Sequence, residues 1–263
     1  MGAALVSAGY PVTGVSARSR ASRERAARLL PDVPVVEPAE VVGRADVVIL
    51  AVPDDAIAEV AGSLPFTEDQ YAVHLSGAHG IAVLRGIAAT PVALHPPMTF
   101  TDAPASLAGV VFTATAPDRA LVERLVKDLG AEVQWIAEER RALYHAGLVH
   151  GANHLVTLVS QAVDVLRAAG IADPSATLRP LLTATLDNTL RSGHDALTGP
   201  ILRGDVDTVQ AHLAVLRGRP ASTYAELARA TVELAAGDGR LDRETAARFG
   251  EVLERDRTGE APR

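Results

Sequence analysis

Cysteine is absent from the sequence, and lysine occurs once, at Lys127, among 263 residues. The absence of cysteine excludes disulfide bonds, thiolate zinc sites, iron–sulfur clusters and cysteine nucleophiles. Because Lys127 lies on a predicted surface helix, no catalytic lysine is expected either. No apolar run reaches the ~18 residues of a membrane-spanning helix, and the first residues lack the basic region of a secretory signal. We therefore expect a soluble, cytoplasmic protein with no membrane partner.

Basic residues are too few for a surface that binds nucleic acid. Lysine and arginine total 25 against 32 acidic residues, which gives a net charge of −7. Nucleic-acid-binding domains carry a basic face, so this class of protein is not expected. The apolar share of 48% and charged share of 22% are typical of a globular protein. The length suits one large or two smaller domains.

The first half of the chain alternates between short apolar runs and helical patterns. The run at 46–52 is apolar on both faces, which is typical of a parallel strand covered by helices. The predicted strands are 12–17, 33–36, 46–52, 71–75, 92–95, 110–114 and 132–136, and the predicted helices are 2–9, 22–30 with Ser22 as N-cap, 40–44, 55–62 and 117–129.

The second half contains helical patterns almost exclusively. Glycines separate the predicted helices 138–169, 174–192, 205–216, 222–236 and 242–255. Alternating strands and helices followed by helices alone predict an α/β fold with a doubly wound parallel sheet, then an all-α domain. We expect the first domain to cover residues 1–137 and the second to cover residues 138–263.

The start of the chain carries only part of the pattern that opens a dinucleotide-binding unit. Such a unit begins with a strand, continues through G-x-G-x-x-G and enters a helix. Here the helix and the second strand follow Met1, but the first strand and first two glycines do not precede them. Gly2 would then be the third glycine, or simply a small residue near the terminus. We expect an N-terminally incomplete domain in which 12–17 and 46–52 lack a shared neighbour.

Arginine ends the second predicted strand, at Arg18 and Arg20 on either side of Ser19. An acidic residue at this place would hold the ribose of NAD, whereas arginine suits the 2′-phosphate of NADP. The planar guanidinium binds phosphate through two parallel hydrogen bonds. These three residues are therefore predicted to contact NADP, with NAD less favoured. The alternative is that both arginines are solvated surface charges.

Several longer segments carry a resemblance to a known family. They are V-S-A-R-S (15–19), A-V-P-D-D (51–55), H-L-S-G-A-H-G (74–80), L-H-P-P-M-T-F (94–100), Y-H-A-G-L-V-H-G-A-N-H-L-V-T-L (144–158) and L-T-G-P-I-L-R-G-D (197–205). With them, nearly the whole chain resembles Rossmann-like oxidoreductases with a C-terminal DUF2520 domain. These are relatives of pyrroline-carboxylate reductase, prephenate dehydrogenase and the hydroxyacid dehydrogenases. The helical domain resembles that of 6-phosphogluconate dehydrogenase, which implies a homodimer formed through it.

The ends of predicted parallel strands supply one group of candidate site residues. The resemblance implies that Val52 and Pro53 lie against the nicotinamide–ribose side of the cofactor. A simple turn with Asp54 as N-cap is the alternative, and both can hold. Ser76 could form a hydrogen-bonding wall of the pocket. His95 belongs to a segment similar to the H-P-M segment that borders the substrate site of prephenate dehydrogenases.

Two further histidines are placed near the same edge. We expect His74 to be a buried strand residue, because it lies within the run 71–75. For His79, an exposed loop position and a position in the site are about equally favoured.

A second group of candidates lies on the long predicted helix. At ~100° per residue, His150, Asn153 and His154 share one face. The resemblance aligns His150 with a proton-donating lysine of hydroxyacid dehydrogenases and aligns Asn153 and His154 with two asparagines. His150 would donate a proton, Asn153 would orient the carbonyl and His154 would contact substrate. Packed polar groups are the second interpretation. A metal pair is the third, since no further ligand is evident, and no metal is expected.

Residues 197–205 supply the last group. Thr198 and the Gly199 amide could bind a carboxylate, with Arg203 nearby, because the segment is similar to the T-S-P-G-G segment of pyrroline-carboxylate reductases. An ordinary helix start with Pro200 in its first turn is the alternative. Together the patterns predict an NADP-dependent oxidoreductase that reduces a small anionic ketone or imine, with 2-dehydropantoate suggested by analogy. A non-catalytic protein that binds or senses NADP is the alternative function.

Overall fold

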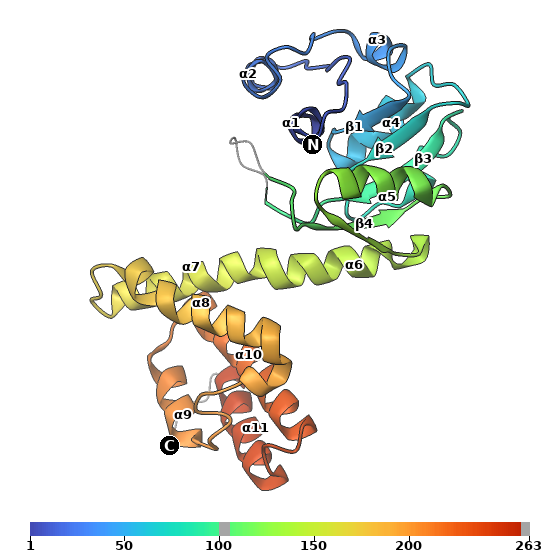
Figure 1. The fold of residues 1–263 in the computed structure, drawn as a ribbon. Coiled ribbons are helices and arrows are strands. Elements are labelled where there is room, and N and C mark those ends of the chain that lie inside the picture. The colour runs from blue at the N-terminus through green and yellow to red at the C-terminus, as the bar shows by residue number, and fades with distance from the viewer. Residues whose placement is uncertain (100–105, 259–263) are drawn as a thin grey trace. The chain divides into compact units, whose positions relative to one another are not determined.

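The computed structural model describes residues 1–99 and 106–258. These residues form two compact units, Met1–Gly151 and Ala152–Arg263, which are considered separately (Figure 1). The division falls later than the boundary expected near residue 137. The reason is that Arg141 and Tyr144, at the start of the long helix, make hydrogen bonds within the first unit.

The first unit is built on a five-stranded sheet in the order β1-β2-β3-β4-β5. The β1–β2, β2–β3 and β4–β5 pairs are parallel, and β3 and β4 are antiparallel. This arrangement confirms the predicted α/β fold with a mostly parallel sheet. The strands are β1 (Val47–Leu50), β2 (Tyr71–His74), β3 (Thr90–His95), β4 (Val111–Thr115) and β5 (Glu132–Trp135).

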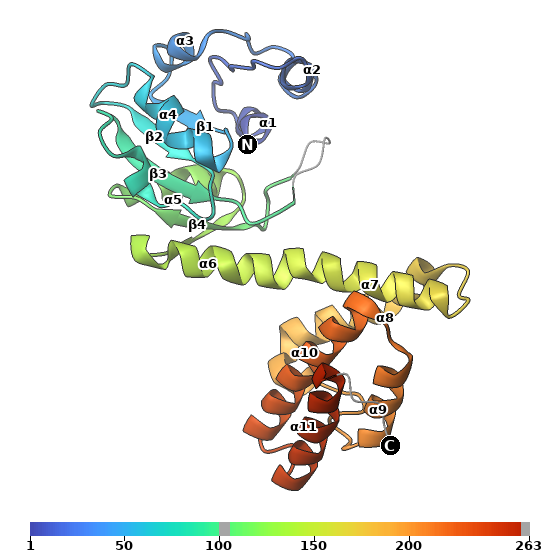
Figure 2. The same ribbon diagram turned by 180° about the vertical axis from the view of Figure 1, so that it is seen from behind.

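Helices cover both faces of this sheet because alternate residues of its strands point to opposite sides. Val48 and Leu50 of β1 pack with α4 (Ile57–Gly62) in one hydrophobic cluster. Val47 and Ile49 of the same strand belong to a second cluster with α5 (Arg119–Asp128). Figure 2, seen from behind, shows α4 and α5 on opposite faces of the sheet. Two short helices, η1 (Asp54–Ala56) and η2 (Ile81–Leu84), follow β1 and β2.

The segment before β1 contains short helices and one isolated bridge. The helices are α1 (Gly2–Ser7), α2 (Arg20–Leu29) and α3 (Pro38–Val42). The strands predicted at 12–17 and 33–36 are reduced to a single parallel bridge between Val15 and Val35. Within the described residues β1 pairs with β2 alone, and Val15 forms its bridge with Val35.

The N-cap predicted for α2 is wrong. The hydroxyl of Ser19 accepts a hydrogen bond from the Ser22 amide, so the helix begins three residues earlier than expected. Both positions hold serine, which is a favoured N-cap residue. The local backbone decides which of the two hydroxyls faces the free amides of the first turn.

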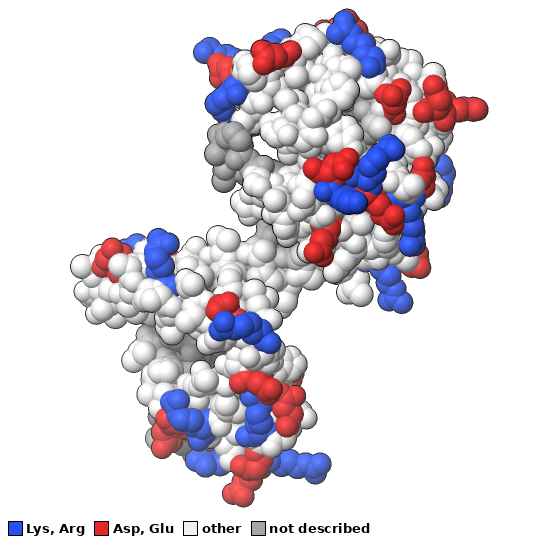
Figure 3. All heavy atoms as spheres, viewed as in Figure 1, with Lys and Arg blue, Asp and Glu red and all other residues white. Residues whose placement is uncertain are grey.

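The long helix predicted over 138–169 is not uniform. After η3 (Glu138–Arg140) it consists of α6 (Arg141–Leu148), a π segment (Val149–Asn153) and α7 (His154–Ala168). No Asp, Glu, Lys or Arg occurs between Arg141 and Asp164. The space-filling view accordingly shows an uncharged surface along most of α6 and α7 (Figure 3).

The second unit is helical throughout its described residues. After α7 come α8 (Pro174–Ser192), η5 (Gly193–Ala196), α9 (Val206–Val215), α10 (Gly218–Gly237) and α11 (Arg243–Thr258). Its core joins α9, α10 and α11 through Val209, Ala235, Phe249 and Leu253. In residues 1–99 and 106–258, no helix is long and apolar enough to cross a membrane.

Candidate functional site

The loops after β1 and β2 meet at the carboxyl edge of the parallel strands. The Ser76 hydroxyl donates to Asp54 Oδ2 at 2.6 Å and accepts from the amides of Ala78 and His79 at 3.2 and 3.1 Å. Asp54 therefore does not act as the N-cap of η1, where Pro53 holds the cap position without a side-chain hydrogen bond. Ser76 instead links the two loops and fixes the turn that carries Gly77.

His74 is a structural residue, as the sequence predicted. Its side chain is fully buried. Nε2 lies 2.9 Å from the Gly80 carbonyl oxygen, and Nδ1 accepts from the Ser76 amide at 3.3 Å. A neutral ring with its proton on Nε2 satisfies both contacts. Burial lowers the pKa of His74, which keeps the ring neutral.

His95 ends β3 beside Tyr144 of α6. Its Nδ1 atom lies 2.8 Å from the Tyr144 hydroxyl, and the two rings meet edge to face with centroids 5.7 Å apart. Burial, together with the nearby Arg141 and His145, lowers the pKa of His95 to about 4, while Asp54 opposes the change. The imidazole of His95 is therefore neutral at pH 7 and can donate through only one nitrogen.

Gly77 lets two imidazole rings approach the same loop. A Cβ atom at this position would lie 3.0 Å from His145 Cδ2 and 3.0 Å from His95 Cε1. Any larger residue would displace at least one ring. The structure thus brings His145 to the edge of the sheet next to His95.

Arg141 is buried beneath this group with only 1% of its surface exposed. Its guanidinium donates to Thr115 Oγ1 at 3.0 Å, to the Ser76 carbonyl at 3.2 Å and to the Ala93 carbonyl at 2.8 Å. A longer contact of 3.4 Å reaches the Thr113 carbonyl. One cationic side chain therefore holds together the carboxyl end of β2 and the middle of the β3–β4 pair.

The carboxylate of Glu138 fixes the same loop from the other side. It accepts from the amides of Ile81 and Ala82 at 2.8 and 2.9 Å, at the start of η2. A Cβ atom on Gly80 would collide with this carboxylate. The loop 76–82 is therefore held at both ends, by Ser76 and by Glu138.

Sequence reasoning missed Arg141, Tyr144 and His145. Arg141 follows Glu138, Glu139 and Arg140 and looks like part of a solvated charged turn. The available signal was the i, i+3, i+4 spacing of the three residues, which places them on one face of a helix.

The other predicted helix residues lie further along the chain. His150 and Asn153 are exposed in the π segment, and His154 is exposed at the first position of α7. π turns are rare and occur frequently at functional sites. The predicted shared face assumes α-helical geometry, but His150 and Asn153 lie in the π segment and only His154 lies in an α-helix.

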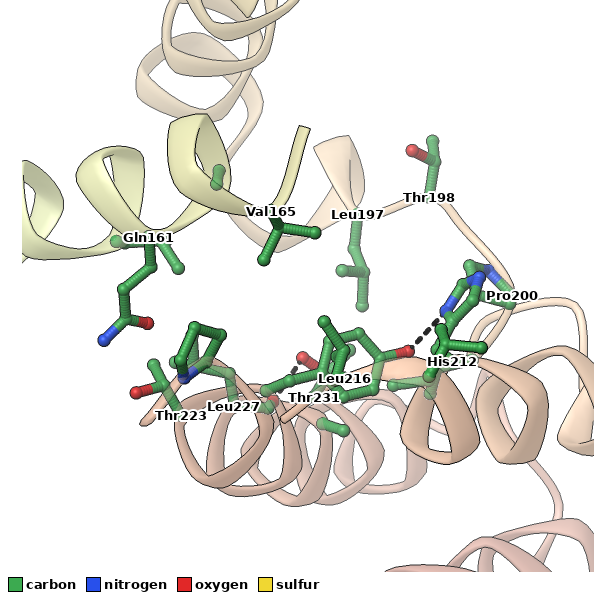
Figure 4. Close-up of a pocket in the computed structure, with 17 residues that line it drawn as sticks. Gln161, Val165, Leu197, Thr198, Pro200, His212, Leu216, Thr223, Leu227 and Thr231 are labelled. Atoms are coloured by element: carbon green, nitrogen blue, oxygen red, sulfur yellow. Dashed lines mark hydrogen bonds between the residues drawn. The ribbon is translucent and has the colours of Figure 1, made fainter. Parts of the chain in front are cut away.

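Thr198 lines a separate cavity within the second unit. The cavity has a volume of about 550 Å³, and its walls come from α7, the segment 197–201, the end of α9 and α10 (Figure 4). Gly199 has a φ of +103°, and Arg203 is exposed. The alternative of a helix start at Pro200 is not borne out, because α9 begins after Asp205, its N-cap, as the predicted helix 205–216 indicated.

The residues predicted to contact the cofactor all lie in the first 53 residues, before β2. Arg18, Ser19 and Arg20 are exposed at the start of α2, and Arg20 pairs with Glu24 at 2.7 Å. A Cβ atom on Gly2 would lie 3.1 Å from Leu30 Cδ1, so a glycine allows α1 to approach the end of α2 closely. The half-buried Val52 and the exposed Pro53 follow β1 directly. Among the described residues, no three His, Asp or Glu side chains are placed to hold a metal ion.

This fold and edge site define a Rossmann-like protein with a helical C-terminal region. Residues 1–96 match the Rossmann-like domain family, and residues 108–231 match DUF2520, a domain of unknown function. The chain belongs to the proteins that combine these two domains. No curated protein sequence matches it.

Three solved structures illustrate the similarity of the fold. A candidate NADP oxidoreductase from Bacteroides fragilis is 24% identical, with a TM-score of 0.75, covering 87% of this chain and 91% of its own. An imine reductase variant from Myxococcus stipitatus in complex with NAD⁺ is 19% identical, with a TM-score of 0.62, covering 94% and 93%. A reductive aminase from Aspergillus terreus in complex with NADPH and ethyl levulinate is 15% identical, with a TM-score of 0.61, covering 98% and 91%. At these identities the likeness concerns the fold.

Proposed function

We propose that this protein is an NADP-dependent reductase that acts on a small anionic ketone or imine. The observation that carries the proposal is the group of Ser76, His95 and Tyr144 at the carboxyl edge of the parallel strands. Ligands of open α/β sheets bind outside this edge. The names of the similar structures, which include a candidate NADP oxidoreductase and an NADPH complex of a reductive aminase, support the same reaction class.

The residues at the start of α2 fit the 2′-phosphate of NADP. Arg18 and Arg20 are exposed guanidinium groups, and the Arg20–Glu24 pair is an exposed ion pair that a phosphate could replace. In this proposal Gly2, Ser19, Val52 and Pro53 complete the cofactor contacts. When bound, NADPH supplies the hydride for the reduction.

The sequence proposes further substrate contacts in each of the two units. Ser76 and His95 would border the substrate, and His150 with Asn153 would supply a proton and orient the carbonyl or imine. His154, Thr198, Gly199 and Arg203 are the further proposed substrate contacts. No acidic residue occurs from 142 to 163, the stretch that contains His150 and Asn153. The absence of negative charge there supports an anionic substrate.

The test is NADPH oxidation by the purified protein with a panel of 2-oxo acids and cyclic imines that includes 2-dehydropantoate. We expect turnover with at least one member, and slower turnover with NADH. A His95→Gln variant should lose activity, and Arg167→Gln, on the exposed surface of α7, should retain it. NADPH binding without turnover on any member would favour a non-catalytic NADP-binding or sensing protein instead.

We also propose that a second copy of the chain covers α8. Pro174 is the only buried residue of this 19-residue helix, and Leu186 and Leu190, one turn apart, are 50% and 79% exposed. Leu155 and Val156 of α7 add further exposed apolar surface to the same unit. Monomeric proteins rarely expose contiguous apolar patches of more than a few hundred Å², and a two-fold dimer would bury this surface against itself.

Sedimentation velocity tests the dimer. Wild-type protein should sediment as a dimer, and the Leu186→Glu and Leu190→Glu double variant should sediment as a monomer. Ser175→Glu, at the exposed start of α8, is the matched control and should remain dimeric. A monomeric wild type would contradict the proposal.

A further inference from the structure

We propose that the Tyr144 hydroxyl donates the proton that completes substrate reduction, with His95 as the group that returns a proton to it. The proposal rests on the proposed reductase function and assigns to Tyr144 the transfer that the helix pattern predicts for His150. It follows from the position of the hydroxyl, its hydrogen bond and the charges around it.

The Tyr144 hydroxyl lies at the carboxyl edge of the parallel strands. Tyr144 is half-buried on α6, and its hydroxyl lies 2.8 Å from Nδ1 of His95, the last residue of β3. Ser76 and Asp54 follow the neighbouring strands β2 and β1, and their side chains are joined by a hydrogen bond of 2.6 Å. The hydroxyl therefore belongs to the same edge of the sheet where a substrate of this fold class binds. His145 and Gly77 are also part of this group.

A buried cation, Arg141, accompanies Tyr144 on α6. A tyrosine that gives up its proton carries a negative charge, which needs a nearby cation in a partly dry environment. Arg141 lies one turn before Tyr144 on α6, is buried and interacts electrostatically with it. The guanidinium cannot lose its own proton in a protein. It is therefore a permanent cation that stabilises the tyrosinate as it forms.

The protonation of His95 decides the direction of its hydrogen bond with Tyr144. Burial, Arg141 and His145 all lower its pKa, and Asp54 alone raises it. A neutral ring carries one proton. When this proton is on Nδ1, the ring donates to the Tyr144 oxygen and leaves the hydroxyl proton directed at another acceptor. That acceptor would be the substrate oxygen or nitrogen.

The proton balance then closes. The substrate carbon receives a hydride from the dihydronicotinamide, and the substrate oxygen or nitrogen receives the Tyr144 proton. The tyrosinate takes the Nδ1 proton of His95 while Nε2 of the same ring takes a proton from solvent, so the ring stays neutral throughout. Exchange with solvent then returns the ring proton to Nδ1. The net change is consumption of one dihydronicotinamide and one proton for each alcohol or amine formed.

A measurement on the free protein tests the hydrogen bond without any substrate. Nitrogen NMR of histidine-labelled protein, assigned with His95→Gln, reports which ring nitrogen of His95 carries the proton. We expect a protonated Nδ1 at pH 7, with a shift of its signal in Tyr144→Phe. An unprotonated Nδ1 would mean that Tyr144 donates to His95. This result would overturn the proposed role of Tyr144 without contradicting the proposed reductase function.

Kinetics then test the transfer. Tyr144→Phe should lower kcat by about 100-fold or more, as expected for loss of a general acid, with the Kd for NADPH changed less than about twofold. Tyr71→Phe removes a hydroxyl at the amino end of β2 that binds Asp118, and should leave kcat unchanged. Full kcat in Tyr144→Phe, combined with a large loss in His150→Ala, would assign the proton to His150. A wild type without turnover on the whole panel would overturn the proposed function and this role together.

Discussion

Replacement of Arg141 by methionine should destabilise the first unit by about 3 kcal/mol. The change removes the donors of three close hydrogen bonds, to Thr115, Ser76 and Ala93. A buried acceptor left without a donor costs ~1–3 kcal/mol. The lower end applies here, because a carbonyl oxygen keeps a second lone pair and removal of a buried cation returns part of its desolvation cost.

Urea unfolding followed by tryptophan fluorescence measures this effect. Trp135 is the only tryptophan and lies on β5 of the first unit, with the Arg119 guanidinium 4.6 Å from its ring. For a urea slope of ~1–3 kcal/mol/M, a loss of about 3 kcal/mol lowers the midpoint by about 1–3 M. Arg141→Lys keeps the charge but lacks the planar fork, so it should fall between methionine and wild type.

Two results would refute this reasoning. The first is a free energy of unfolding of the methionine variant within about 0.5 kcal/mol of the wild-type value, the range typical of surface substitutions. It would show that the three acceptors find other donors. An unchanged pKa of His95 in the same variant would show that the guanidinium does not act on the ring. We expect that pKa to rise, yet to stay below its ordinary value because burial is its main cause.

Three further predictions concern the same edge and the cofactor. The pKa of His95 is about 4 in the folded protein, and the ring's unperturbed pKa is ~6.5. As the pH falls, His95 therefore takes up a proton in the unfolded chain before it does so in the folded protein. Stability should therefore fall as pH drops from about 6.5 towards 4, and less so in His95→Gln, as urea titrations at several pH values would show. Gly77→Ala should displace a ring and lower turnover with little loss of NADPH affinity; equal activity would show that the rings can give way. Replacing Arg18 and Arg20 by serine should weaken NADPH binding roughly 10–100-fold and NADH binding little, because a hydrogen bond to a charged group contributes ~1.5–3 kcal/mol. Calorimetry measures both affinities, and equal losses for the two cofactors would exclude a 2′-phosphate contact.

Local sequence patterns were sufficient to predict most of the secondary structure. The apolar run before Pro53 becomes β1, and the alternation of strands and helices ends where the sequence indicated. The helix 174–192 is bounded by Asp173 and Gly193, and both bounds match the structure. These features depend on side-chain periodicity and on capping, which act within a few residues of the chain.

Part of the site could be predicted for the same reason. The carboxyl ends of parallel strands meet at one edge of a sheet, so Ser76 was expected there from its place after a predicted strand. His95 was expected there from its place at a strand end and from the resemblance of its segment to the H-P-M segment. The start of α9 agrees with the predicted helix 205–216, whereas the N-cap of α2 was wrong, because Ser19 and Ser22 compete for that cap. Which serine caps the helix depends on the path of the backbone, which the residue types alone do not specify.

Only the tertiary structure decided what surrounds His95. Arg141 reads as a solvated charge in the sequence, yet it is buried and donates to Ser76 and Ala93, which are 65 and 48 residues away. The contact between His95 and Tyr144 joins residues 49 apart and depends on how the start of α6 packs on the sheet. The lowered pKa of His95 arises from burial and neighbouring charges, which exist only once these distant segments are folded together.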